Sequence, residues 1–219
     1  MSIGAEVPRD RAKRLLTGRG RFVDDIQLPR MLHLAFVRSP YAHARIEAID
    51  TAGAISMPGV IAVYTAKELE DAVSSWRPEH KLFPTMAAPE QHALAKETAR
   101  WQGEAVAAVV AESRAQAEDA AEHVAVTWHE LPAVTDAKAA LATDAAVLHD
   151  DMTTNLAFST EIVTGDVALA FRDAAHVVEE HFRFNRHSGV SLEPRGIIAE
   201  FEPGENRLTV HQSHQTPHQ

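Results

Sequence analysis

Nine stretches of the chain show the alternation of apolar and polar residues, or the short apolar run, that is typical of β-strands. They are residues 31–37, 44–49, 60–64, 105–111, 124–128, 157–163, 177–184, 197–201 and 208–210. The run at 105–111 (AVAAVVA) is apolar throughout, which indicates a buried strand. The stretch at 177–184 instead places Val178, Phe182 and Phe184 on one side of a strand and charged residues on the other. The pattern therefore predicts a chain rich in strands.

A strand, a helix and a second strand follow one another over residues 103–128. Ser113 and Gln116 have the spacing of a capping box, in which two side chains satisfy free amides at a helix start. Small apolar residues then recur at helical spacing, at Ala117, Ala120, Ala121 and Val124. The period changes to two at Val124, where the second strand begins. The sequence predicts a β–α–β unit whose alanine-rich helix packs closely on a sheet.

Further short helices are predicted outside this unit. Thr65 and Glu68 repeat the capping-box spacing at the start of a short apolar-faced segment. Residues 165–171 begin with Gly-Asp and predict another short helix. Residues 74–100 have no clear period and contain three prolines, so we interpret them as a long surface excursion with a short helix near 91–96.

These elements predict a mixed α+β protein divided into four parts. Residues 1–17 form a basic arm, and residues 18–134 form the first domain. Residues 135–154 are rich in alanine and polar residues and are interpreted as a linker containing at most one short helix. Residues 155–219 are predicted to begin a second domain.

The last elements predict a β-hairpin with polar residues at both ends. Its strands, 197–201 and 208–210, are separated by the turn sequence PGEN at 203–206. The sequence EPRG at 193–196 precedes the hairpin, and a cluster of histidine and glutamine follows it. Because polar chemistry is concentrated in the final residues, we expect a truncated chain or a site that a partner completes.

Composition and charge exclude several classes of function. Hydrophobic residues make up 45% and charged residues 24% of the chain, as in ordinary globular proteins. The net charge of −10 disfavours a nucleic-acid partner, since such proteins use clustered lysine and arginine. The chain has no cysteine, which excludes disulfides, zinc–thiolate sites and iron–sulfur clusters held by its own residues. No apolar run reaches the roughly 18–20 residues of a membrane span, so we expect a cytoplasmic protein with no membrane partner.

Histidines near the C-terminus are the first candidates for metal binding. His211, His214 and His218 lie within the last nine residues, and neutral imidazole is a good metal ligand. However, His211 and His214 are three residues apart, so an extended strand cannot place both on one side unless Ser213 opens a turn. No carboxylate stands at a fixed metal-binding spacing from them. We therefore favour surface or interface histidines over a metal site.

The remaining candidates have structural explanations. The sequence at 193–196 suits a turn into a strand, since proline fixes φ and glycine permits positive φ. Ser188 and Ser191 lack the context of a nucleophile elbow. Pairs of adjacent carboxylates are interpreted as solvated side chains, and they occur at 24–25, 150–151 and 179–180. The residues alone therefore do not establish a reaction.

Six segments, in order along the chain, resemble the large, molybdopterin-binding subunit of the molybdenum hydroxylases. This superfamily includes xanthine dehydrogenase, aldehyde oxidase and aerobic carbon monoxide dehydrogenase. Four segments are similar to its α/β-hammerhead domain: residues 16–25, 34–46, 57–66 and 101–107. Two are similar to the start of its first molybdenum-cofactor-binding domain: residues 192–196 and 208–219. The resemblance implies a hammerhead domain at 18–134 and the first strands of a molybdenum domain at 155–219.

The resemblance also implies cofactors, partners and a substrate class. A molybdenum–pterin cofactor is expected in the complete enzyme, and iron–sulfur clusters and FAD are expected in partner subunits, which agrees with the absence of cysteine here. The substrate is expected to be a small molecule. It would be an aldehyde, a purine or an N-heterocycle hydroxylated with oxygen from water, or carbon monoxide.

One residue is assigned to the cofactor by the resemblance. In the family, the glutamine of the segment that resembles residues 215–218 (QTPH) lies beside the molybdenum centre and can hydrogen-bond to its ligands. Gln215 is therefore predicted to contact the cofactor, because an amide donates or accepts without adding charge. His218 is predicted to shape the same loop. Glu193 and Arg195 also match a family motif, which implies no catalytic role for them.

The family subunit continues for several hundred residues beyond the point that resembles Gln219. Its later part holds glycine-rich pterin-contacting loops and a glutamate that acts as general base. We therefore expect no catalytic residue in this chain, a partner polypeptide that supplies the rest of the molybdenum domain, and no activity of the chain alone. Two alternatives stay open: a non-catalytic assembly module that keeps the hammerhead fold, and a truncated inactive product.

Overall fold

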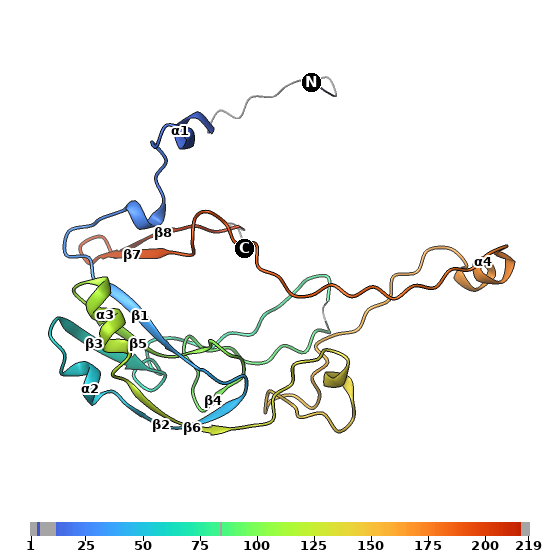
Figure 1. The fold of residues 1–219 in the computed structure, drawn as a ribbon, viewed down its shortest axis with the longest axis horizontal. Helices are drawn as coiled ribbons and strands as arrows, with labels where there is room; N and C mark the ends of the chain where they lie inside the picture. Colours follow the sequence, from blue (N-terminus) through green and yellow to red (C-terminus); the bar gives the residue numbers. More distant parts are fainter. Residues whose placement is uncertain (1–3, 5–11, 84, 216–219) are drawn as a thin grey trace. The chain divides into compact units, whose positions relative to one another are not determined.

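A computed structural model of the protein describes residues 4, 12–83 and 85–215 (Figure 1). The described residues form two compact units. The larger unit is Arg30–Ala175, and the smaller one combines the described parts of Met1–Pro29 and His176–Gln219. Both units contain helical turns and strands, which confirms the mixed α+β class.

Two three-stranded antiparallel sheets build the larger unit. In the first, β5 (Ala105–Ala111) lies between β1 (His33–Arg38) and β3 (Val60–Thr65). In the second, β2 (Ala44–Asp50) lies between β4 (Thr98–Ala99) and β6 (Ala125–Glu130). All five strands predicted between residues 31 and 128 are present.

Helix α3 (Arg114–Ala121) packs on β1 and β5 of the first sheet (Figure 1). The Ser113 hydroxyl accepts a hydrogen bond from the Gln116 backbone N–H at 3.3 Å and donates to Gln116 Oε1 at 2.7 Å. The predicted cap is confirmed, although the Gln116 side chain returns to the hydroxyl and not to the backbone. Gly59 has φ +80°, and a Cβ added there would lie 2.1 Å from Gln116 Nε2, so glycine is required beside this cap.

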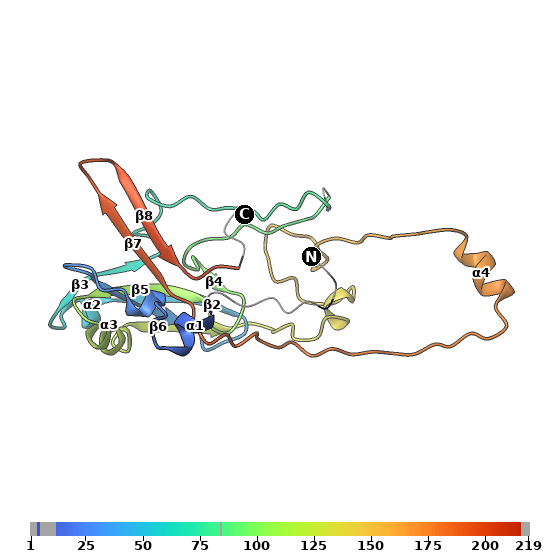
Figure 2. The same ribbon diagram turned by 90° about the horizontal axis from the view of Figure 1, so that it is seen from above.

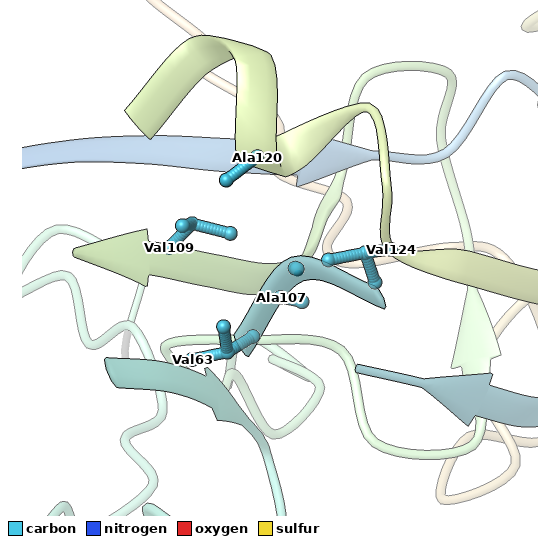
Figure 3. Close-up of a cluster of buried hydrophobic side chains, with 6 residues drawn as sticks. Val63, Ala107, Val109, Ala120 and Val124 are labelled. Atoms are coloured by element: carbon cyan, nitrogen blue, oxygen red, sulfur yellow. The ribbon is translucent and has the colours of Figure 1, made fainter. Parts of the chain in front are cut away.

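Small side chains form the core between α3 and the first sheet. Ala120 on α3 points toward Val109 on β5 (Figure 3). The cluster also contains Ala54, Val63, Ala107 and Val124, all buried. The largest fully buried side chains are valines. Because alanine and valine fill the contact, the helix lies close to the sheet, as its alanine-rich face predicts.

The other face of the first sheet carries large apolar side chains that stay exposed in this unit. Leu34 and Phe36 on β1 are 53% and 45% exposed, and Tyr64 on β3 is 39% exposed. Phe36 and Tyr64 flank Ala108 of β5 on either side, and Leu34 lies beside Val110. Neighbouring residues on β5 therefore face different surroundings, since Val109 points into the core and Val110 points away from it.

The helices predicted outside the β–α–β segment of residues 103–128 are only partly present. The helix expected after Thr65 is wrong: the Thr65 backbone N–H donates to Glu68 Oε2 at 2.7 Å, but residues 66–72 form turns. A single capped turn gains too little to repay helix nucleation. The short helix expected near 91–96 is also absent, and Gln91 instead forms an isolated bridge with Trp76.

Five short helical segments complete the described secondary structure. Helix α4 (Val167–Asp173) confirms the prediction at 165–171, and its N-cap Asp166 accepts a hydrogen bond from the Leu169 N–H at 2.8 Å. The others are α1 (Ala12–Leu16), α2 (Ala52–Ile55) and two 3-10 turns, η1 (Val23–Asp25) and η2 (Ala139–Leu141). None of the helices in the described residues is long and apolar enough to span a bilayer.

The strands predicted at 157–163 and 177–184 are wrong. Both segments are irregular in the structure and pair with no strand of the described chain. Some of their apolar side chains are almost fully exposed, with Ile162 at 91% and Phe184 at 90%, whereas Phe158 is 40% exposed and stacks on Phe83. A strand needs a hydrogen-bonded partner strand as well as a suitable pattern, and the described residues supply only one backbone hydrogen bond here, from the Ala87 N–H to the Ala157 carbonyl at 2.8 Å.

Two arginines join the excursion that follows β3 to the segment that precedes α4. Arg77 Nη1 lies 2.7 Å from Asp151 Oδ2, and this contact lowers the pKa of the Asp151 carboxyl group. Arg100 Nε donates to the Leu148 carbonyl at 2.9 Å, and its Nη2 lies 3.2 Å from Asp150 Oδ2. Each carboxylate of the pair at 150–151 therefore interacts with an arginine. The interpretation of this pair as solvated side chains did not include these contacts.

The smaller unit contains the predicted C-terminal hairpin. Strands β7 (Ile197–Glu202) and β8 (Arg207–Gln212) pair antiparallel from Ile197↔Gln212 to Glu202↔Arg207, and Figure 2 shows them side by side. Asn206 adopts φ +49° in the connecting turn, a conformation that asparagine tolerates better than most residues. The hairpin prediction is confirmed.

Candidate functional site

The segment that leads into the hairpin is fixed to the η1 turn. Glu193 Oε1 accepts a hydrogen bond from the Val23 backbone N–H at 3.1 Å. A Cβ added to Gly196 would lie 3.1 Å from Val23 Cγ1, so the glycine allows the two segments to approach closely. This geometry gives Glu193 a structural role, in which it joins chain segments 170 residues apart in sequence. Arg195 is exposed beside it.

Ser213 Oγ connects the two polar ends of the hairpin, and Ser191 Oγ forms a hydrogen bond within the segment that precedes β7. Ser191 Oγ donates to the Glu193 carbonyl at 2.8 Å. Ser213 Oγ, just after β8, donates to the Pro194 carbonyl at 3.4 Å. The segment before β7 and the segment after β8 therefore lie next to each other. Sequence analysis singled out both segments, and the antiparallel pairing brings them together.

Gln215 lies at this end of the hairpin, three residues after β8 ends. Its side chain is exposed. The amide can therefore donate and accept hydrogen bonds at the surface of the smaller unit. Contact between Gln215 and a cofactor stays a prediction, and His218 lies outside the described residues.

His211 and His214, the described histidines of this region, belong to no metal-binding cluster of described residues. β8 ends at Gln212, and Ser213 and His214 continue without a turn. Among residues 4, 12–83 and 85–215, no group of three or more histidine, aspartate or glutamate side chains is placed to hold a metal ion. The described part of this end therefore offers hydrogen-bonding groups and not a ligand set.

A second polar cluster lies in the larger unit, around His43 and His149. His43 is only 7% exposed, and its Nδ1 lies 2.8 Å from the Pro132 carbonyl oxygen. Burial lowers the pKa of His149 below its ordinary value of 6.5, and the positive charge of Arg100 acts in the same direction. The nearby carboxylates Asp150 and Asp151 oppose this shift, and His43 adds to it. His149 is therefore held in its neutral form.

Replacing His149 with glutamine is expected to flatten the pH dependence of stability below pH 6.5. Because the pKa of His149 is lower in the folded chain than in the unfolded chain, the unfolded chain binds more protons in the window between the two values. The wild-type free energy of unfolding should therefore fall as pH decreases through that window. Urea unfolding at a series of pH values from 7 to about 5 measures this slope.

The control for this prediction is His123→Gln, at an exposed position after α3. This variant should keep the wild-type slope over the same pH range. A His149→Gln protein whose stability declines as steeply as that of the wild type would contradict the prediction.

Comparison with known proteins gives two consecutive family matches. The family model described as "Aldehyde oxidase and xanthine dehydrogenase, a/b hammerhead domain" matches residues 17–132. The model described as "Molybdopterin cofactor-binding domain" matches residues 148–219. Together the two matches fall on the two regions into which the sequence pattern divided most of the chain.

Individual relatives agree with these matches. The chain is 38% identical over 218 residues to the nicotine 6-hydroxylase large subunit of Paenarthrobacter nicotinovorans, covering 99% of this chain and 26% of the relative. It is 37% identical over 227 residues to the carbon monoxide dehydrogenase large chain of Hydrogenophaga pseudoflava, covering 96% and 28%. The crystal structure of quinoline 2-oxidoreductase from Pseudomonas putida 86 superposes with a TM-score of 0.86 at 38% identity, covering 96% and 26%. The chain spans about a quarter of the length of these relatives.

Proposed function

Since the chain belongs to the aldehyde oxidase and xanthine dehydrogenase family of molybdenum hydroxylases, we propose that it is the N-terminal portion of a molybdopterin-binding large subunit. In this proposal it is one piece of a hetero-oligomeric oxidoreductase and needs further polypeptide for activity. Its relatives include subunits of enzyme complexes, such as the 6-hydroxypseudooxynicotine dehydrogenase complex subunit gamma of Paenarthrobacter nicotinovorans. We place the hammerhead domain at 18–134, a linker at 135–154 and the start of the molybdenum domain at 155–219.

The observation that carries the proposal is the set of exposed apolar side chains on the smaller unit. Phe184 and Leu192 are 90% and 99% exposed. Ile197 on β7 and Leu208 on β8 are 67% and 61% exposed. Single exposed apolar residues are common, but a series of large ones indicates a surface that another part covers. This supports the remaining molybdenum-domain polypeptide as the partner.

The residues at the hairpin end fit a molybdenum–pterin cofactor that is held mainly by other polypeptide. Gln215 offers an exposed neutral amide, which would hydrogen-bond to ligands of an oxo-metal centre without adding charge. The described residues offer no cluster of metal ligands, so we propose that this chain contacts the cofactor without ligating the metal. When bound, the cofactor would supply the redox chemistry that oxidises the substrate. The hydrogen bonds of Glu193 and Ser213 would position the Gln215 segment.

We also propose the substrate class and partners of the complete enzyme. The substrate is an aldehyde, a purine or an N-heterocycle, or carbon monoxide. Iron–sulfur and FAD subunits would carry electrons away from the cofactor, because a chain without cysteine does not hold iron–sulfur clusters by itself. The assembly would work in the cytoplasm.

Purification of the tagged chain from its native host tests this proposal. We expect it to co-purify with the rest of the molybdenum domain, either as a second polypeptide or as a continuation that is encoded directly downstream. Iron–sulfur and flavin subunits should accompany it, and deletion of the gene should abolish hydroxylase activity. Sequencing the DNA after the codon for Gln219 is the first step.

The isolated 219-residue chain is the control for cofactor analysis, and it should contain neither molybdenum nor pterin. A stoichiometric metal signal from the isolated chain would overturn the proposed division of the cofactor site. Absence of any molybdenum-domain partner, together with unchanged activity after deletion, would instead favour a non-catalytic assembly module.

A further inference from the structure

A polar hollow lies on the larger unit, beside the second sheet. Its walls come from three parts of the chain that are distant in sequence: the start of β2, the start of β4, and loops after β6. Main-chain hydrogen bonds hold these parts together, since the Ile46 N–H donates to the Glu97 carbonyl at 2.8 Å and the Leu131 N–H donates to the His43 carbonyl at 2.9 Å. The hollow is therefore built into the sheet and does not depend on one mobile loop.

His43 presents a hydrogen-bond acceptor to this hollow. Its Nδ1 lies 2.8 Å from the Pro132 carbonyl oxygen, which only accepts, so Nδ1 carries a proton, and in the neutral ring Nε2 is the acceptor. No side-chain nitrogen or oxygen in the described residues is both inaccessible to solvent and unpartnered. Nε2 has no hydrogen-bond partner among the described residues, so the small exposed fraction of His43, 7%, includes Nε2. His43 is one of the residues that line the hollow.

Carboxylates also line the hollow. Glu47, Glu97 and Asp150 contribute to its lining, against one cationic side chain, Arg45. Asp150 already interacts with Arg100 at 3.2 Å, whereas Glu47 and Glu97 are exposed and form no ion pair with the described residues. The polar groups that face the hollow therefore favour a ligand that is positively charged and donates hydrogen bonds.

Apolar side chains complete the lining. Ile46 and Leu131 are half-buried in the wall, and Val147 is 38% exposed. An arginine or lysine side chain combines an apolar stem with a cationic head, so it matches a hollow with both kinds of lining. Arginine matches better, because its planar guanidinium group can donate to a carboxylate and to an imidazole nitrogen at the same time.

We propose that this hollow is a docking site for an arginine side chain of a partner polypeptide. The guanidinium group donates to His43 Nε2 and pairs with Glu47 and Glu97, while its methylene groups contact the apolar wall. This site lies in the hammerhead part of the chain and does not involve Gln215. Its existence does not depend on the molybdenum chemistry of the complete enzyme.

The test is an NMR titration of the isotope-labelled chain with Nα-acetyl-arginine amide at low ionic strength. We expect saturable shifts confined to residues of the hollow, including the His43 ring nitrogens. Nα-acetyl-citrulline amide has nearly the same shape without the charge, and it should bind several-fold more weakly. Nα-acetyl-lysine amide carries the same charge without a guanidinium group. Comparing its binding with that of the arginine compound shows whether the hollow requires the guanidinium group or only a positive charge. Added salt should weaken arginine binding, because the carboxylates are exposed.

Matched carboxylate variants show whether the charges act through this site. Glu97→Gln should weaken arginine binding about two- to fivefold, and the Glu47→Gln/Glu97→Gln double variant should weaken it further. Glu112→Gln removes an exposed carboxylate outside the hollow and should leave binding unchanged. Equal binding of citrulline, no effect of the double variant, or an equal effect of Glu112→Gln would overturn the proposal. All three variants change exposed positions, so the fold is expected to persist, and circular dichroism checks it.

Discussion

Replacing Gln215 with glutamate is expected to lower the kcat of the assembled enzyme by about 10- to 100-fold, the range typical of groups that support a metal centre from outside its ligand shell. The amide in our proposal donates a hydrogen bond to a ligand of the molybdenum centre. A carboxylate of the same shape cannot donate when ionised, and it brings a negative charge next to the oxygen ligands of the metal. Gln215→Ala removes the donor without adding charge, so it should cause a smaller loss.

Gln212→Glu is the matched control for this experiment. Gln212 is the last residue of β8, is exposed, and pairs with Ile197 through the backbone of the hairpin. The same change of charge at that position should leave kcat close to the wild-type value. Steady-state kinetics and molybdenum content should be measured together for each protein. If Gln215→Glu and Gln212→Glu had the same kcat at equal molybdenum content, the assignment of Gln215 to the cofactor would be wrong.

Replacing Val109 with aspartate is expected to destabilise the larger unit by at least about 4 kcal/mol. Val109 is fully buried on β5 against Ala120 of α3, and no cationic side chain belongs to this cluster. A carboxylate at this position would have to take up a proton, or the core would have to open so that water reaches the charge. Single domains are stable by only about 5–15 kcal/mol, so much of the protein should be unfolded or aggregated. Urea unfolding followed by circular dichroism measures the loss.

The neighbouring substitution Val110→Asp tests the same reasoning with the opposite expectation. Val110 is next to Val109 on the strand but points to the other face of the sheet, beside the exposed Leu34. A carboxylate at Val110 can stay hydrated, so the loss should be well below that of Val109→Asp. Similar losses for the two variants would show that the two faces of β5 do not differ as the structure indicates.

Local signals were sufficient to predict much of the larger unit. The cap at Ser113, the alanine spacing of α3 and the apolar run of β5 act over a few residues, and each appears where the sequence indicates. The strand expected at 177–184 has an equally clear pattern and is absent, because pairing depends on a neighbour that the described chain does not provide. The helix expected after Thr65 failed for an energetic reason, since its cap forms but the segment is too short to extend.

The candidate sites differ in how far the sequence could indicate them. The resemblance to a family pointed to Gln215, and no spacing rule did so. The link between Glu193 and Val23 joins segments 170 residues apart, so local pattern could not suggest it. The hollow that contains His43 combines side chains from three distant parts of the chain. No pattern in the sequence indicated this hollow, and His43 was not among the candidate residues.

The alanine- and valine-rich contact between α3 and the first sheet has a thermodynamic consequence. Alanine loses almost no side-chain rotamer entropy on burial, and it also removes little apolar area from water. The heat-capacity change on unfolding scales with the apolar area exposed, so it should be small for a unit of this length. A small heat-capacity change makes the curve of stability against temperature broad and shallow. The larger unit is therefore expected to resist cooling well, with its stability changing little over a wide range of temperature.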